Sequence, residues 1–505
     1  MTTVRIDPSA DAEQASREMF DSLNPATDEV VGSYPAHSEE EVREAVARAR
    51  QAAVWWADLG FDGRAERLMR WKGVITRRMA QLAGVVHDET GKPHSDALLE
   101  IVIAIDHINW SAKNARKVLG QQRRPAGLLM SNQAATVEYQ PLGVIGVIGP
   151  WNYPVLTPLG SIAYALAAGN AVVFKPSEYT PGVGAWLADA FDDVVPEEPV
   201  FQLITGFGAT GAALCRAGVN KLAFTGSTNT GKKIMAACAE TLTPVLIEAG
   251  GKDALLVDDD ADLDAAADAA VWGGMSNAGQ TCVGTERVYV HEKVYDEFVA
   301  KVVAIAKDLR PGNDRDAKYG PATMPSQLGV IRSHIEDALR RGGTAVVGGG
   351  ADAVGDRYVQ PTVLVDVPED SVAVRDETFG PTLTIAKVRD MDEAVALAND
   401  SRYGLASAVF AKRRGMELAR RLRAGMTSIN SVISFAGVPS LPFGGVGDSG
   451  FGRIHGPEGL KEFTWAKAIT RQRFRTPMAV TSFARTAKTD GLVAKAVTLL
   501  HGRRR

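Results

Sequence analysis

Among the three cysteines of the chain, Cys282 lies in the sequence least suited to a buried core. It follows SNAGQT, a run of small and amide residues, whereas Cys215 and Cys238 stand among alanines in helical patterns. A free cysteine most often serves as a small buried residue, and that interpretation fits the other two. Cys282 is therefore the candidate nucleophile, provided that its thiol can be deprotonated.

Two further polar residues follow apolar runs at positions suited to chemistry. Glu248 ends the run VLIE and is followed, after one alanine, by two glycines, while GPWNYP places Asn152 between two prolines. A carboxylate at the end of a buried strand is well placed as a general base. A rigidly held amide can donate to an oxyanion. The structural alternatives are a surface carboxylate for the first residue and a turn residue for the second.

The segment KLAFTGSTNTGKK, residues 221–233, approximates the phosphate-binding loop of ATPases. Lys233 stands where that loop needs a serine or threonine as a magnesium ligand, so the motif fails at a necessary residue. The order of strand, turn and helix remains, and a helix N-terminus attracts phosphate. We therefore expect Gly226 and Ser227 to hold a pyrophosphate that is not cleaved.

Two other short motifs are less informative. GFGATG at 206–211 fits the dinucleotide fingerprint GxGxxG, but no acidic residue follows at the usual distance, and an ordinary glycine-rich turn explains it equally well. GDSG at 447–450 also occurs in the nucleophile loop of trypsin-like proteases, which requires an all-β barrel with a suitably placed histidine and aspartate. The α/β pattern of the chain argues against that interpretation.

The elements that must position these residues alternate along the chain. After helical patterns at Ser38–Arg78 and Ser95–Leu119, apolar strand-like runs alternate with helical patterns from Thr136 to Gly250. Such alternation predicts a parallel, doubly wound sheet, in which ligands bind at the carboxyl ends of the strands. A second alternating region follows Gly250 and includes ALLVD, RVYVH, AVVGGG, PTLTIAKV, ASAVF and TSIN, which predicts a second α/β domain.

Bulk composition restricts the possible functions. A chain of 505 residues accommodates two or three domains, and a formal charge of −4 gives no reason to expect nucleic acid as a partner. The three cysteines lack metal-ligand spacing, so we expect a reducing compartment, no disulfide framework and no metal site. The sequence shows neither a secretory signal nor an apolar run long enough for a membrane span, which predicts a cytoplasmic protein.

A larger set of motifs identifies a family. GPWNYP, VFKPSEYTP, FTGSTNTG, EAGGKD, NAGQTC, ETFGP, TSIN and LPFGGVGDSGFGR occur in the order found in NAD(P)-dependent aldehyde dehydrogenases. The chain resembles that superfamily from about residue 20 to residue 470, and several motifs in one order are far more specific than any single match. LPFGG and PWNYP resemble the branches that act on fatty, aromatic or betaine-type aldehydes.

The resemblance implies roles for individual residues. Cys282 would be the nucleophile, Glu248 the general base, and Asn152 the oxyanion donor beside the backbone N–H of Cys282. The residues implied in cofactor binding are Lys175, Glu178, Gly208, Gly226, Ser227, Trp151, Glu377 and Phe379.

Within that cofactor set, Lys175 and Glu178 would reach the adenosine ribose, whereas Glu377 and Phe379 would position the nicotinamide ribose and ring. The carboxylate of Glu178 would repel a 2′-phosphate at close range, so we predict NAD in preference to NADP. The chain departs from the family pattern at Ala249, where leucine is usual. This change affects the shape of the pocket beside the base rather than the reaction.

The resemblance also implies an α/β fold with two doubly wound parallel-sheet domains and a small β oligomerisation arm. In the arm, Gln121 to Gln140 would pair with the strand-like segment from Ala468 to Phe474. A partner subunit would cover the exposed edges of these strands in a homodimer or homotetramer. The basic, amphipathic tail could touch an anionic membrane surface, although we favour a solvated terminus. The boundaries are 1–120 and 141–249 for the dinucleotide-binding domain, 250–445 for the catalytic domain, 121–140 and 465–480 for the arm, and 481–505 for the tail.

The implied reaction is oxidation of an aldehyde to its carboxylic acid. Thiolate attack gives a hemithioacetal, loss of hydride gives a thioester, and water activated by Glu248 releases the acid. One alternative is a cofactor-independent thiol esterase that uses the same Cys282 and Glu248. The intact set of catalytic residues argues against a non-catalytic binding protein, and Glu248 argues against transfer of the acyl group to coenzyme A.

The expected substrate tunnel is apolar. No arginine occurs in the segments that would form it, which favours aliphatic or aromatic aldehydes over succinic semialdehyde or another semialdehyde. The residues expected to line it are Tyr153, Val155, Leu156, Leu159, Val283, Ile433 and Phe435.

Overall fold

The computed structural model describes residues 18–127, 130–475 and 480–502 of the chain. Across these ranges it contains no helix that is both long enough and apolar enough to cross a bilayer. The chain divides into two compact units. The larger unit contains two extended β-sheets with their helices, and the smaller unit contains one three-stranded sheet and a helix.

The larger unit comprises the described residues up to Val118 together with Pro141–Thr464, and its first extended sheet has six strands. Five of them run parallel, as the alternation of strands and helices predicts, and the short β17 pairs antiparallel with β9 at one edge. The strand order is β17 (Gly450–Phe451), β9 (Val245–Ala249), β8 (Lys221–Gly226), β5 (Val144–Ile148), β6 (Ala171–Lys175) and β7 (Phe201–Leu203).

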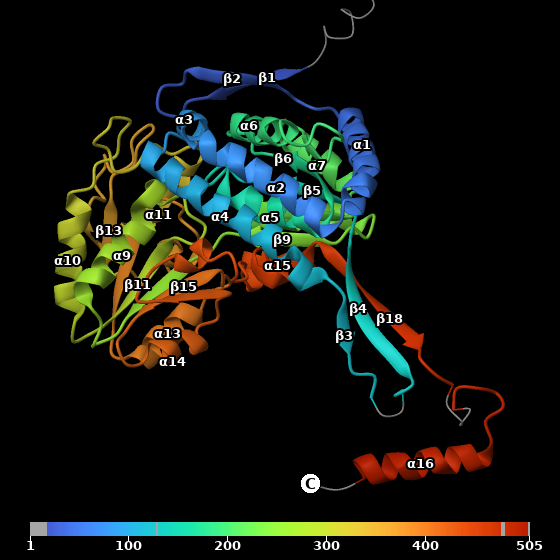
Figure 1. Ribbon diagram of the computed structural model, residues 1–505. Helices are drawn as coiled ribbons and strands as arrows, with labels where there is room; N and C mark the ends of the chain where they lie inside the picture. The colour runs from blue at the N-terminus through green and yellow to red at the C-terminus, as the bar shows by residue number, and fades with distance from the viewer. Residues whose placement is uncertain (1–17, 128–129, 476–479, 503–505) are drawn as a thin grey trace, which may run out of the picture. The chain divides into compact units, whose positions relative to one another are not determined.

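Helices surround this first sheet (Figure 1). Helix α1 begins with a capping box, in which Ser38 and Glu41 satisfy each other's backbone N–H groups. Helix α5 is apolar all round and is almost entirely buried, as expected for a helix that has no solvent face. The helices are α1 (Glu39–Asp58), α2 (Gly60–Arg77), α3 (Met79–Thr90), α4 (His94–Leu119), α5 (Leu156–Ala168), α6 (Pro181–Asp192), α7 (Gly208–Arg216) and α8 (Thr228–Ala239).

The second extended sheet has seven strands, of which only the edge strand β12 runs antiparallel. An edge strand has a single neighbour, so its direction is less constrained than that of a central strand. The order is β12 (Thr344–Val347), β13 (Thr362–Val365), β14 (Thr382–Val388), β11 (Thr285–His291), β10 (Asp253–Val257), β15 (Ala406–Phe410) and β16 (Met426–Ile429).

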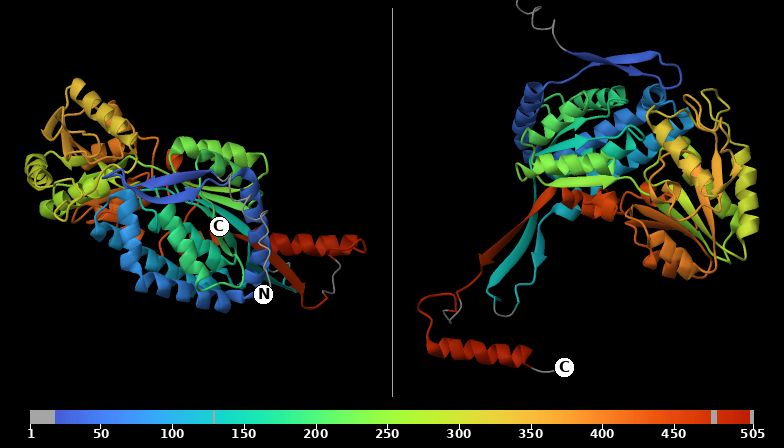
Figure 2. Two further views of the ribbon diagram at one scale, coloured as in Figure 1. Left: turned by 90° about the horizontal axis from the view of Figure 1, so that it is seen from above. Right: turned by 180° about the vertical axis from the view of Figure 1, so that it is seen from behind.

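Both faces of this sheet are covered by helices, because alternate residues of β10 point to opposite sides. Leu255 and Val257 pack with residues of α9 and α10, whereas Ala254 and Leu256 pack with residues of α13 and α14. Figure 2 shows this sheet and its helices beside the six-stranded sheet. The helices are α9 (Leu263–Met275), α10 (Tyr295–Lys307), α11 (Gln327–Arg340), α12 (Val372–Arg375), α13 (Met391–Asn399) and α14 (Gly415–Arg421). The last helix of the larger unit, α15 (Gly456–Glu462), contacts α5 beside the first sheet.

The predicted α/β fold is confirmed, with helices layered on both sides of two mainly parallel sheets. The run AVVGGG predicted a strand at β12 but not its antiparallel direction, and the sequence did not predict β17. It also did not predict β13, α11 or the amino-terminal hairpin, which pairs β1 (Met19–Leu23) with β2 (Val30–Pro35). Its strands are largely exposed and therefore lack the buried pattern that marks a core strand.

The smaller unit joins two distant parts of the sequence. It comprises Leu119–Gln140 and the described part of Trp465–Arg505, and therefore includes the predicted arm and tail segments. Strand β4 (Gln133–Pro141) lies between β3 (Gln122–Arg124) and β18 (Thr464–Gln472). Helix α16 (Ala487–His501) is capped by Thr486, whose side chain accepts from the Thr489 N–H. The helix has no buried residue.

Candidate active site

The loop that carries Cys282 has an unusual backbone. It follows a short 3₁₀ turn, Ser276–Gly279, in which Asn277, Ala278 and Gly279 have φ values of 52°, 57° and 72°. Consecutive left-handed residues are rare because each costs about 1–2 kcal/mol when a Cβ is present. At Gly279 a Cβ would lie 2.0 Å from the carbonyl oxygen of Gly380, so only glycine fits there. The half-buried thiol of Cys282 is therefore placed by tertiary contacts.

Glu248 lies opposite this thiol. It is in β9, beside Thr225 of the parallel neighbour β8, and its Oε2 accepts from the Thr225 hydroxyl at 3.2 Å. Its Oε1 lies 3.7 Å from Sγ of Cys282, close enough for the thiol to donate to the carboxylate. The candidate base in the first sheet and the candidate nucleophile in the loop before β11 of the second sheet therefore meet directly.

Burial shifts the protonation of both groups. Desolvation raises the pKa of Glu248 to about 7, against the opposing effect of hydrogen bonds from Thr225 and Cys282. Desolvation also raises the pKa of the Cys282 thiol well above its usual value, and the nearby charges of Glu248 and Glu377 act in the same direction. The resting site therefore favours a neutral thiol with a carboxylate within reach of its proton.

Asn152 is buried in the loop between β5 and α5, and its amide faces the cysteine loop. Its Nδ2 donates to the carbonyl oxygen of Gln280 at 3.0 Å. The backbone carbonyl oxygen of Asn152 accepts from Nζ of Lys92 at 2.7 Å and from Nδ2 of Asn277 at 3.1 Å. This loop is therefore fixed to the segment that precedes Cys282.

A buried ion pair supports the Asn152 loop from the other side. The side chains of Lys92 and Glu100 are each 1% exposed, and Nζ lies 2.9 Å from Oε2. Glu100 also accepts from the Val155 N–H at 3.2 Å, and Nζ of Lys92 lies 4.3 Å from the centre of the Tyr153 ring. Sequence reasoning missed both charged residues. Their position, eight residues apart around the start of a long helix, gives no direct signal of burial.

A cavity of about 890 Å³ lies at the carboxyl ends of the strands of the first sheet. All the site residues expected from the sequence line this cavity except Glu248, and Ala249 lines it as well. The wall includes Gly226 and Ser227 at the start of α8, where helix N–H groups favour an anion. A Cβ at Gly208 would meet no atom within 4 Å. These features fit a dinucleotide.

Two charged residues lie at one part of this cavity. Lys175, at the end of β6, is buried, and its Nζ donates to the Pro176 carbonyl oxygen at 2.9 Å. Glu178 is 38% exposed, and its Oε2 lies 4.0 Å from that Nζ. A carboxylate this open to the cavity is free to accept from ribose hydroxyls.

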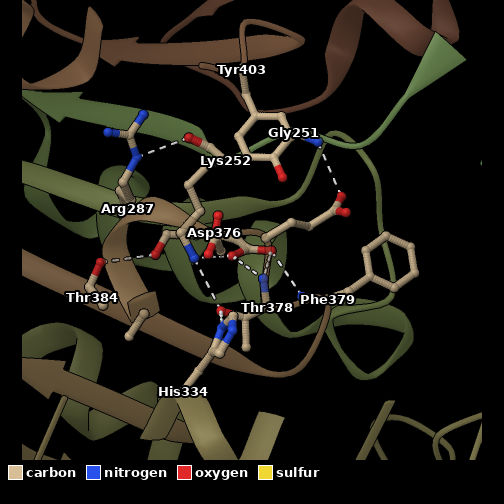
Figure 3. Close-up of polar contacts among 12 residues, drawn as sticks. Gly251, Lys252, Arg287, His334, Asp376, Thr378, Phe379, Thr384 and Tyr403 are labelled. Carbon is tan, nitrogen blue, oxygen red and sulfur yellow. Dashed lines mark hydrogen bonds and ion pairs between the residues drawn. The ribbon is translucent and has the colours of Figure 1, made fainter. Parts of the chain in front are cut away.

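Another part of the cavity is formed by the loop that follows α12 (Figure 3). The Glu377 carboxylate accepts from the Gly251 N–H at 3.1 Å. Desolvation, assisted by the charge of Glu286, raises the pKa of Glu377 to about 8. The Phe379 ring meets the Trp151 ring edge-on, with 5.6 Å between centroids. A polar group and an aromatic wall therefore flank the same space.

A second cavity, of about 250 Å³, meets the first at Cys282, which lines both. Among its described lining residues are the acidic Asp96, Glu100 and Glu248, but no arginine or lysine. Val155, Leu159 and Phe435 are buried and do not line it, contrary to expectation. The apolar residues that line it are Leu99, Ile103, Tyr153, Leu156, Trp272, Val283, Val432, Ile433, Ala436, Phe443 and Ile454.

Sequence reasoning missed the contribution of α4 to this second cavity. Asp96, Leu99, Glu100 and Ile103 recur at intervals of one, three or four residues, so they share one face of the helix. That spacing was readable from the sequence, although nothing in it indicated which surface the face would meet.

The structure therefore combines two mainly parallel sheets with a dinucleotide-sized cavity whose wall includes Cys282 and Asn152, and Glu248 contacts that cysteine. Solved aldehyde dehydrogenases have this fold. The sequence profile described as "Aldehyde dehydrogenase family" matches residues 12–469. The chain belongs to the aldehyde dehydrogenase family.

Individual relatives agree with this assignment. The chain is 36% identical over 461 residues to the 4,4′-diapolycopene aldehyde oxidase of a Methylomonas species, covering 90% of this chain and 86% of the relative. It is 36% identical over 455 residues to the glutarate-semialdehyde dehydrogenase of Pseudomonas aeruginosa, covering 88% and 92%. The crystal structure of an NAD-dependent aldehyde dehydrogenase from Sinorhizobium meliloti superposes with a TM-score of 0.87 at 33% identity, covering 92% and 93%.

Proposed function

We propose that the protein oxidises an apolar aldehyde to the carboxylic acid, with NAD as the electron acceptor and Cys282 as the covalent nucleophile. The observation that carries this proposal is the position of one sulfur atom. Cys282 Sγ lies 3.7 Å from the Glu248 carboxylate and lines both the dinucleotide-sized cavity and the apolar cavity. A thiol in this place can reach reactants in both cavities.

The residues would act in sequence. Glu248, directly or through water, takes the thiol proton, and the sulfur bonds to the aldehyde carbon. The Asn152 amide and the Cys282 N–H donate to the resulting oxyanion, and loss of one such donor typically costs about a hundredfold to a thousandfold in rate. NAD, when bound, accepts the hydride. Glu248 then removes a proton from water, which attacks the thioester and releases the acid.

The proposed cofactor contacts are those of the first cavity. Gly208, Gly226 and Ser227 would surround the pyrophosphate, with the Trp151 ring and the Glu377–Phe379 loop at the nicotinamide end. Lys175 and Glu178 would bind the adenosine ribose.

We expect the specificity constant to be higher with NAD than with NADP. The Glu178 carboxylate lies at the ribose end of the proposed site, and two like charges at close range repel each other. The measurement is kcat/KM for each cofactor at a saturating aldehyde concentration, repeated on Glu178→Gln. The substitution should narrow the difference between the cofactors. A wild-type preference for NADP would reject this placement of Glu178.

The second cavity favours substrates without a negative charge. Its described lining combines apolar side chains with three carboxyl groups and lacks a cation that would pair with a substrate carboxylate. The substrates named for the two relatives differ, one being a diapolycopene aldehyde and the other a semialdehyde, which carries a carboxylate. The lining supports the first type for this chain, and a semialdehyde is the alternative.

A panel of aldehydes tests the proposed function. With NAD present, absorbance of the reduced nicotinamide should rise, and kcat/KM should increase with the apolar size of the aldehyde. Aldehydes of matched length that carry a carboxylate should be poorer substrates. A semialdehyde as the best substrate would contradict the proposed class, and no reduction of NAD with any aldehyde would reject the function.

A thiol esterase is the second candidate. The direct contact between Cys282 and Glu248 needs no cofactor, so hydrolysis of an activated ester is chemically possible at the same atoms. Ester hydrolysis without any NAD-dependent aldehyde oxidation would favour this alternative.

We also propose that the smaller unit mediates assembly into a homodimer or homotetramer. Strands β3 and β18 are the edges of its sheet, and exposed edges are commonly covered by a partner strand. The domain boundaries, the cytoplasmic location and membrane contact by the basic tail stay predictions.

A further inference from the structure

The loop of Glu377, Thr378 and Phe379 is held by a buried ion pair that no sequence motif indicated (Figure 3). The side chains of Lys252 and Glu286 are 1% and 8% exposed, and Nζ of the lysine donates to Oε2 of the glutamate. The same Nζ donates to the Thr378 hydroxyl at 3.1 Å. A buried charge requires such pairing, because desolvation of a lone ion costs several kcal/mol, roughly, even after relaxation.

The Glu286 carboxylate binds the loop through its backbone. Its oxygens accept from the Thr378 N–H at 3.1 and 2.9 Å and from the Phe379 N–H at 3.0 Å. Phe379 has a φ of 52°, a conformation that costs about 1–2 kcal/mol for a residue with a Cβ. Hydrogen bonds from backbone N–H groups to a buried carboxylate are strong enough to hold that conformation.

Other side chains fix the same residue from further directions. Nε2 of Gln327 donates to the Thr378 carbonyl oxygen at 2.7 Å, and Nδ1 of His334 lies 3.0 Å from the Thr378 hydroxyl. Thr378 is therefore bound at its N–H, its carbonyl oxygen and its hydroxyl. The two neighbours of Thr378, by contrast, turn their side chains into the cofactor cavity.

Those two side chains depend on the backbone between them. The Glu377 carboxylate sits so close to Gly250 that a Cβ there would approach it to 2.0 Å. The Phe379 ring packs edge-on against Trp151. A shift of the loop backbone would move both side chains together.

We propose that Glu286, held in place by Lys252, is a positioning residue that sets the Glu377–Phe379 loop for the nicotinamide end of the cofactor. The inference rests on the proposed use of NAD. The alternative is that the ion pair only stabilises the fold. Buried ion pairs can often be replaced by uncharged residues without loss of stability, so function and stability can be separated here.

The test uses the full-length protein with two variants. Glu286→Gln removes the charge and converts one accepting oxygen into a donor, and Lys252→Met/Glu286→Gln leaves no unpaired lysine. Asp260→Asn is the matched control, because Asp260 also accepts two backbone N–H groups and pairs with an arginine, but lies just beyond the other end of β10. Each protein is measured for melting temperature, NADH binding, emission of bound NADH, the rate of Cys282 alkylation and aldehyde turnover.

We expect bound NADH in both Glu286 variants to emit more like free NADH, because the nicotinamide end is no longer held. NAD-dependent turnover should fall by about a hundredfold, the typical effect of a misplacement on the order of 1 Å. Cofactor-free alkylation of Cys282 should not change. Asp260→Asn should match the wild type in NADH emission and turnover.

Wild-type NADH emission and turnover in the double variant would overturn the proposal. If the variants lose NADH binding only in proportion to a lowered melting temperature, the Lys252–Glu286 ion pair serves stability alone. A different result would contradict the proposed function, namely that the wild type does not reduce NAD with any aldehyde. The emission of bound NADH is measured without aldehyde and therefore tests the role of Glu286 separately.

Discussion

Cys282→Ala is expected to lower aldehyde oxidation by roughly 10⁴-fold or more, since removal of a covalent nucleophile eliminates the whole pathway. The variant should fold and bind NADH, because Cys282 is only half-buried and its replacement removes one sulfur atom from the wall that the two cavities share. The measurement is NADH formation with excess enzyme, together with NADH binding and thermal unfolding.

The control for this substitution is Cys238→Ala. Cys238 is 1% exposed within α8, where it fills the core, so its replacement should lower stability and leave turnover near the wild-type level. Undiminished NAD reduction by the Cys282 variant would remove the basis for covalent catalysis in this protein. Equal losses in both variants would mean that cysteine replacement acts through folding.

Glu248→Gln is expected to separate hydride transfer from hydrolysis. Without a carboxylate to accept a proton from water, the thioester should accumulate, and turnover should fall by roughly 10²- to 10⁴-fold. Mixing enzyme, NAD and aldehyde should then give a burst of NADH that matches the concentration of active sites, followed by a much slower phase. The burst should itself be slower than hydride transfer in the wild type, because Glu248 also takes the thiol proton. A progress curve without a burst and at the wild-type rate would contradict the assignment.

The pH dependence gives a second test of the same residue. Burial raises the pKa of Glu248 to about 7, so at lower pH the carboxyl group is mostly protonated and cannot act as a base. Where hydrolysis limits the wild type, turnover should therefore rise as the pH increases through about 7 and then level off. The same rise should be absent from the slow phase of Glu248→Gln.

The fold was readable from the sequence because buried parallel strands leave a clear pattern. Continuous apolar runs such as Val144–Ile148 and Asp253–Val257 mark strands that are covered on both faces. The run AVVGGG predicted the edge strand β12 but not its antiparallel direction, because that direction depends on which strand the fold brings beside it. Its first three residues are also partly exposed, so its apolar pattern is weaker.

The candidate site likewise contains residues that the sequence indicated and residues that it did not. Cys282, Glu248 and Asn152 could be selected because each is a chemically capable residue in a local context that does not suit a core. The sequence did not indicate Lys92, Glu100 or Glu286 as site residues. Each supports the site through a buried ion pair whose partner is known only from the fold. Glu286 offered one usable sign, since it lies in the strand-like run TERVYVH, and burial of that strand requires its charge to find a partner.

The left-handed turn before Cys282 has a consequence for the newly made chain. Residues 277–279 hold a conformation that short peptides avoid and that persists only when surrounding structure enforces it. Glu248, the proposed proton acceptor, lies in β9 of the first sheet. The newly made chain has neither feature, so we expect Cys282 to become the proposed nucleophile only after both sheets have folded.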